Sequence, residues 1–267
     1  MGEKMNHENL TIKKSYILRE LNAIIAVAAR DITLFFKSPA MIIMTLVMPI
    51  FMMGMIGGNM MGLAGGEGLG QFMLVGMLVN MLFMITAMGM ASLVDDHDTD
   101  FNQEMMVSPI SRYSIIIGKI LGSTFAAIVS MVGTLIVGLI MSITLPIEQM
   151  LLILLLSPLM CFAGGAMAMI LIGLIKNPRT ANFAVMIIVM PQMFLSGVII
   201  PINESNITLL VLSRIMPMTY CVDLVRSITG IETPMFNPMI NFAAIVILTL
   251  ICLVIGTFFF ARSETNR

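Results

Sequence analysis

Long apolar runs dominate the pattern of hydrophobic and polar positions along the chain. Six of them reach the roughly 17–25 residues that a helix needs to cross the hydrocarbon core of a bilayer. The pattern therefore predicts an all-α integral membrane protein with six transmembrane helices. The predicted spans cover residues 40–57, 70–93, 114–143, 150–175, 181–200 and 239–261.

A different pattern precedes the first span. On a helix over residues 15–37, one face is apolar and carries Ile17, Leu21, Ile24, Ile25, Ala28, Ile32 and Phe35. The other face carries Arg19, Arg30, Thr33 and Lys37. This pattern predicts an amphipathic helix along the membrane surface, because each charged residue would cost about 2.5–3.5 kcal/mol at the bilayer centre. We expect residues 1–38 to form a cytoplasmic tail with this interfacial helix, and residues 39–267 the six-helix domain.

The basic residues predict the topology. With six spans, the two termini and every second loop lie on the same side of the membrane. Twelve of the 14 basic residues lie in or next to these segments. The remaining two, Arg214 and Arg226, lie in the long segment 201–238 on the other side. By the positive-inside rule, both termini are expected in the cytoplasm of a multi-pass cell-membrane protein. No cleavable signal peptide is expected, because residues 1–15 are polar and no short apolar core with a cleavage site follows.

Composition excludes several classes of protein. Hydrophobic residues make up 58% of the 267 residues and charged ones 11%, whereas soluble domains carry about 25% charged residues. The net charge of −1 gives no basic field for nucleic acid. Cys161, Cys221 and Cys252 are too far apart for a metal or redox motif, so we interpret them as apolar core residues.

Metal sites are not expected either. Asp96, Asp98 and Asp100 have the spacing of a calcium loop, but Phe101 and Val107 stand where that loop needs glycine and glutamate. The 31 methionines occur in every span. A flexible apolar filler explains them more simply than thioether ligands for copper.

Catalytic and ion-coupling groups are sparse within the predicted spans. No Asp, Glu, Arg or His lies in the interior of any of them, and Lys119 is expected to snorkel to the cytoplasmic interface. This disfavours a secondary carrier, although backbone carbonyls can also bind sodium. The chain lacks a phosphate-binding loop as well, so we expect no enzyme activity, and a separate chain must hydrolyse any ATP used.

Between spans two and three the chain reads FNQEMMVSPISRYSIIIGK over residues 101–119. This segment resembles the coupling region of ABC-2 type ABC transporter permeases, in which a glutamate, a short apolar helix, a Ser-Pro break and a Gly-Lys pair follow in this order. The matching residues are Glu104, Ser108, Pro109, Arg112, Gly118 and Lys119. A turn ended by Pro109 would present Met105, Met106 and Val107 to a partner groove. The coupling segment is expected at 95–113.

A second stretch reads FLSGVIIP over residues 194–201 and MPMTYCVDLVR over 216–226. It is similar to the outer end of the fifth span and the short re-entrant outer helices of the same family. The matching residues are Ser196, Gly197, Pro201, Pro217, Thr219, Tyr220 and Arg226, whereas Met216 departs from the usual asparagine. The two motifs, their order and the spans extend the resemblance over nearly the whole chain.

The resemblance implies a set of partners. Two such permeases, identical or related, pair with two cytosolic ATP-binding cassette subunits, and ATP and Mg²⁺ bind to those subunits while this chain binds no cofactor. Exporters of drugs, lipids, polysaccharides and ions share the architecture. Polar residues inside spans two and five are candidates to line the pathway, although interhelical hydrogen bonds explain any one of them equally well. They are Asn80, Thr86, Asn182, Gln192 and Ser196.

Two other functional classes remain open from the sequence. One is an ATP-independent channel or secondary carrier, and the other is a membrane assembly factor that transports nothing. A neighbouring gene for an ATP-binding cassette subunit would favour the exporter over both.

Overall fold

The computed structural model describes residues 2–57, 67–96, 111–143, 145–175, 177–199, 201–202, 207–231 and 235–265. Within these ranges every regular element is helical, which confirms the all-α expectation. The elements are α1 (Gly2–Lys37), α2 (Pro39–Met52), the π-helical turn η1 (Met53–Gly57), α4 (Glu67–Asp96), α6 (Arg112–Ile140), α7 (Ile147–Leu174), α8 (Pro178–Leu195), α9 (Ile207–Ile215), α10 (Pro217–Thr229) and α11 (Pro238–Thr265).

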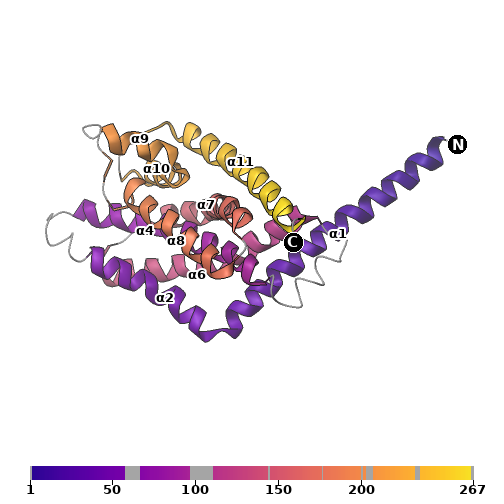
Figure 1. The fold of residues 1–267 in the computed structure, drawn as a ribbon. Helices are drawn as coiled ribbons and strands as arrows, with labels where there is room; N and C mark the ends of the chain where they lie inside the picture. The colour runs from indigo at the N-terminus through magenta and orange to yellow at the C-terminus, as the bar shows by residue number, and fades with distance from the viewer. Residues whose placement is uncertain are drawn as a thin grey trace.

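Helix α4 forms the centre of a bundle and packs against α6, α7, α8 and α10 (Figure 1). Helix α11 lies along α7, while α1 and α2 pack mainly on α6. The end of α11 lies at the end of the bundle from which α1 projects, and α9 and α10 lie at the opposite end (Figure 1). The two ends of the bundle therefore differ: one has α1 and the C-terminal end of α11, and the other has the short helices α9 and α10.

Four helices are long and apolar enough to cross a membrane, or up to six if each of two bent pairs counts as one span. The four lie in α4, α6, α7 and α11, and the bent pairs are α1 with α2 and α9 with α10. The fifth predicted span corresponds to the shorter apolar helix 180–195 in α8. These numbers refer to the described residues, and they agree with a multi-pass membrane protein.

The chain bends by 84° between α1 and α2. The sequence explains this corner, because Ser38 precedes Pro39, and a residue before proline is driven out of the helical conformation. Ser38 has extended backbone angles, and its Oγ accepts a hydrogen bond from the amide of Met41 at 3.4 Å. Ser38 thus ends α1 and caps α2, with Pro39 in the favoured first position.

The fifth predicted span, 181–200, is longer than the helix found. Helix α8 ends at Leu195, and Gly197 follows with a φ of +78°. This left-handed conformation is costly for residues with a side chain, and glycine commonly ends helices in this way. The third predicted span is shortened similarly, because α6 ends at Ile140 and Ser142 has a φ of +60°.

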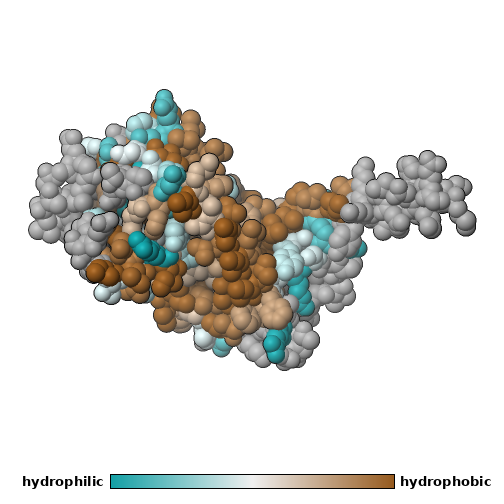
Figure 2. Space-filling model, turned by 90° about the horizontal axis from the view of Figure 1, so that it is seen from above, coloured by the Kyte–Doolittle hydropathy of each residue, from teal (hydrophilic) through white to brown (hydrophobic). Residues whose placement is uncertain are grey.

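The outer surface is largely apolar. Figure 2 shows hydrophobic residues over much of one face, with polar residues confined to small areas. Burial differs between the spans: 78% of the most apolar part of α4 is buried, compared with 22% for α11. Exposed apolar helices are expected where lipid replaces water, so α11 has the surface of a lipid-facing helix and α4 that of a core helix.

Two glycines lie at the contact between helices α7 and α11. A Cβ on Gly173 would lie 2.8 Å from the backbone nitrogen of Phe260, and one on Gly256 would lie 2.9 Å from the carbonyl carbon of Met169. Small residues at such crossings let two membrane helices pack backbone to backbone. The long contact between α7 and α11 therefore depends on the absence of both side chains.

Candidate functional site

The first candidate region is the seam between α1 and α6, next to the predicted coupling segment. Glu104, Met105, Met106, Val107, Ser108 and Pro109 of that segment lie outside the described residues. Ser111 and Arg112 are described, and Arg112 is partly buried at the first position of α6. The structure therefore describes the point at which the coupling segment joins the bundle.

Glu20 of α1 holds the start of α6. Its carboxylate accepts hydrogen bonds from the backbone amide of Ser111 at 3.0 Å and from the hydroxyl of Ser114 at 2.7 Å. The side chain of Ser111 does not cap its own helix. A carboxylate at a helix N-terminus satisfies free amides and interacts favourably with the helix dipole. Glu20 thus caps α6 from a neighbouring helix.

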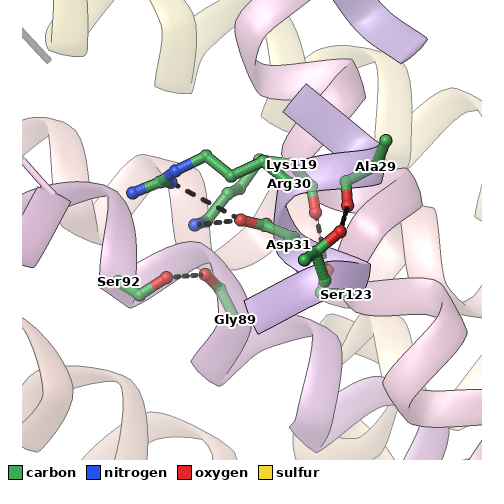
Figure 3. A network of polar contacts seen from close by, with 8 residues as sticks. Ala29, Arg30, Asp31, Gly89, Ser92, Lys119 and Ser123 are labelled. Atoms are coloured by element: carbon green, nitrogen blue, oxygen red, sulfur yellow. Dashed lines mark hydrogen bonds and ion pairs between the residues drawn. The ribbon is translucent and has the colours of Figure 1, made fainter. Parts of the chain in front are cut away.

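Asp31 makes a second polar contact three helical turns further along α1. Its Oδ1 lies 3.0 Å from Nζ of Lys119 on α6 and 3.7 Å from Nη1 of Arg30 (Figure 3). The side chains of Lys119 and Asp31 are 5% and 11% exposed. The sequence analysis expected Lys119 to snorkel to the interface; in the structure its ammonium group is buried and pairs with a carboxylate of α1.

Two glycines allow α1 to approach α6 this closely. A Cβ on Gly118 would lie 2.8 Å from the carbonyl oxygen of Ile24, and one on Gly122 would lie 2.6 Å from Cβ of Asp31. The spacing Gly-x-x-x-Gly places both on one face of α6. The Gly-Lys pair of the sequence motif therefore supplies one contact surface and one ion-pair partner for α1.

The second candidate region lies at the opposite end of the bundle, around Arg226 of α10. Arg226 is 4% exposed, and its Cζ lies 3.4 Å from the centroid of the Phe72 ring. Its Nη2 donates to the carbonyl oxygens of Phe72 at 3.3 Å and Val198 at 3.4 Å. Cation–π contact and carbonyl acceptors compensate the buried charge. Arg226 therefore ties α10 to the start of α4 and to the turn after α8.

Of the other residues in the outer motif, Gly197 lies beside this contact, and the rest have separate structural roles. Gly197 lies in the turn next to Val198, and a Cβ added to it would be 3.6 Å from Nη1 of Arg226. Pro217 occupies the first turn of α10. The hydroxyl of Tyr220 donates to the carbonyl oxygen of Arg214 at 2.7 Å. Pro201 follows the turn and is partly buried.

Asp223 is a structural residue that the sequence analysis did not single out. Its carboxylate accepts from the amides of Met235 at 2.9 Å and Phe236 at 3.0 Å, and from Nδ2 of Asn241 at 2.7 Å. These bonds join α10, the segment after it and α11. The available signal was a single acidic residue in a predicted membrane-associated helix, three positions before Arg226.

The candidate pathway residues fall into two groups. The hydroxyl of Thr86 donates a hydrogen bond to the carbonyl oxygen of Leu82 in the same helix at 2.8 Å. Asn182 is partly buried near the start of α8. Asn80, Gln192 and Ser196 are each 1% exposed. Among the described residues, no hydrogen-bond partner is found for their oxygen atoms. They lie on α4, on α8 and in the turn after α8, and α4 contacts α8.

Comparison with known families bears on both regions. A family described as ABC-2 type transporter matches residues 22–230, from within α1 to just beyond the end of α10. No curated protein matches the chain. The family match covers far more than half of the 267 residues and includes both motifs that carried the resemblance. This chain therefore belongs to the ABC-2 type transporter family of membrane permeases.

Proposed function

We propose that this chain is the membrane-spanning permease subunit of an ATP-driven exporter and that it couples to a separate ATP-binding cassette subunit. The family match over residues 22–230 is the observation that carries the proposal. The sequence has no phosphate-binding loop, which supports the proposal that ATP and Mg²⁺ bind to the partner chain.

In this proposal the chain crosses the membrane six times, with both termini in the cytoplasm. The α1–α2 bend of 84° supports a surface helix followed by a crossing helix, and the α9–α10 bend of 98° supports a re-entrant outer pair. A second copy, identical or related, completes the transporter. Asn80, Gln192 and Ser196 then serve the pathway, since their buried oxygen atoms would gain partners from water or substrate when α8 moves relative to α4.

Coupling would proceed through the segment between α4 and α6. Met105, Met106 and Val107 would fill a groove on the partner, and Glu104 would orient the segment by a charge-assisted hydrogen bond. Because Glu20 binds Ser111 and Ser114, a displacement of this segment would pull on α1 and α6 together. The seam between these two helices would then carry the motion into the bundle.

The test is to express the chain with the candidate ATP-binding subunit and to compare Met106→Asp and Glu104→Ala with the parent. Met106→Asp places an unpaired charge in the groove, at a cost of a few kcal/mol, roughly enough to weaken assembly or uncouple hydrolysis from transport. Met239→Asp, at the exposed start of α11, is the matched control. The measurements are membrane level, co-purification of the partner and transport-stimulated ATPase activity.

Normal assembly and coupling in both variants would refute the coupling assignment. Transport by the chain alone, without ATP or a partner, would instead support the channel or carrier.

A further inference from the structure

Helix α8 packs on the bundle with one face, and α4 is its main neighbour (Figure 1). This face is apolar along most of the helix and becomes polar toward its end. The buried residues recur every three or four positions, and they are Ala181, Val185, Val189, Gln192 and Ser196. The last two therefore place an amide and a hydroxyl at the end of a contact that is otherwise apolar.

Asn80 of α4 lies at the same level. A Cβ on Gly76 would lie 3.1 Å from Cα of Val198, so the early part of α4 meets the turn after α8 and the two helices run in opposite directions. Asn80 follows Gly76 by one helical turn on the same face of α4, about 6 Å further along the helix axis. It is therefore level with the last turn of α8, between Gln192 and Ser196.

The oxygen atoms of these three side chains are buried. Among the described residues, no hydrogen-bond partner is found for Oδ1 of Asn80, Oε1 of Gln192 or Oγ of Ser196. The nitrogen of the Gln192 amide is engaged, because Nε2 donates to Sδ of Met167 at 2.9 Å. A buried acceptor without a donor destabilises a folded protein, and native proteins keep few of them. Three at one level of one helix contact indicate a site that a ligand completes.

We propose that Asn80, Gln192 and Ser196 bind the substrate, and that the substrate is an uncharged amphiphile with hydroxyl groups. Its hydroxyls donate to the three oxygen atoms when α8 moves away from α4 to admit it. The bound state then supplies the donors that these atoms lack in the closed bundle. This inference rests on the proposed transport function and adds the chemical class of the substrate.

The surroundings favour a neutral ligand. Nη2 of Arg226 would lie 3.1 Å from a Cβ on Gly76, one helical turn from Asn80. A cation at Asn80 would therefore be repelled at short range in a medium of low dielectric constant. An anion would face acceptor oxygens, which cannot donate to it. Buried Val189 and Met193 flank Gln192 and can contact the apolar part of the ligand.

The first test is thermal unfolding of the full-length chain in lauryldimethylamine oxide, a detergent without hydroxyl groups. A thiol-reactive dye reports unfolding, because Cys161 and Cys221 are buried. The probes are glycerol monolaurate, its dimethyl ether, laurylamine and laurate, which differ in hydroxyl donors or in charge. Glycerol monolaurate should raise the melting temperature by about 2–4 °C or more, and the other three should not.

The second test uses apolar side chains of similar size, in Asn80→Leu and Gln192→Met. Each should abolish the shift caused by glycerol monolaurate. Each should also raise the melting temperature of the ligand-free chain by about 2–4 °C, because it removes a buried oxygen that has no donor. Thr134→Val is the matched control, since Thr134 is fully buried and its hydroxyl donates to the carbonyl oxygen of Ser130 at 2.9 Å. It should keep the shift and should not stabilise the ligand-free chain.

Equal shifts by glycerol monolaurate and its dimethyl ether, or no shift by either, would overturn the proposal. A shift by laurylamine or laurate alone would overturn it as well, because the substrate would then be charged. Lower melting temperatures in both variants would assign the three oxygen atoms to packing and not to binding. None of these measurements needs an ATP-binding partner. A chain that binds glycerol monolaurate but supports no ATP-driven export would refute the transport function and leave the site in place.

Discussion

Lys119 and Asp31 form a buried ion pair between α1 and α6. Desolvation of such a pair offsets much of its attraction, but removal of one partner leaves an uncompensated charge. Arg30 also approaches Asp31, so the carboxylate retains a cation at 3.7 Å when the lysine is lost. The contact is therefore asymmetric, and loss of Asp31 should be more damaging than loss of Lys119.

We predict that Asp31→Asn destabilises the protein by about 3–5 kcal/mol, because it leaves the Lys119 charge buried without its carboxylate. Asp31→Asn combined with Lys119→Met should be less destabilising than Asp31→Asn alone. Thermal unfolding in detergent can be followed with a thiol-reactive dye, since Cys161 and Cys221 are buried. A double variant at least as unstable as Asp31→Asn would contradict this explanation, because removal of the buried lysine charge would then bring no relief.

At the scale of elements, the apolar runs of the sequence predicted where helices form. The sequence also predicts the corner at Ser38. A residue before proline tends to end a helix, and proline is favoured at the first position of the next one. The sequence did not predict the roles of Glu20 and Asp31. A carboxylate on an amphipathic helix is expected to face water unless the position of the neighbouring helix is known. Their partners on α6 depend on the register between two helices that are far apart in sequence.

The contact between α7 and α11 gives a prediction at this scale. Gly256→Leu should destabilise the protein by about 1–3 kcal/mol or more, because the side chain would separate two backbones in contact. Gly54→Leu is the matched control, since Gly54 is exposed and a Cβ there meets nothing within 4 Å. Thermal unfolding of both variants is the measurement. Equal melting temperatures would mean that α11 can shift away from α7 without cost.

At the scale of the whole molecule, the two ends of the bundle differ in kind. One end has α1, its basic face and the junction with the coupling segment, and the other has α9, α10 and the buried Arg226 (Figure 1). The two motifs that resemble the ABC-2 family lie near these two ends, one motif at each end. The sequence placed Arg226 in the outer motif but could not show its burial, because this depends on the carbonyl oxygens of Phe72 and Val198, which lie far from it in the chain.

The last prediction concerns orientation. Twelve of the 14 basic residues lie on one predicted side, and this bias orients a membrane protein with that side in the cytoplasm. Single cysteines at Asp98 and Asn206, in a background without Cys161, Cys221 and Cys252, should react with impermeant reagent from opposite sides. The cysteine at Asn206 should label in intact cells, and the one at Asp98 only after the membrane is opened. Labelling of both from one side would contradict the six-span topology, because it would require an even number of crossings between them.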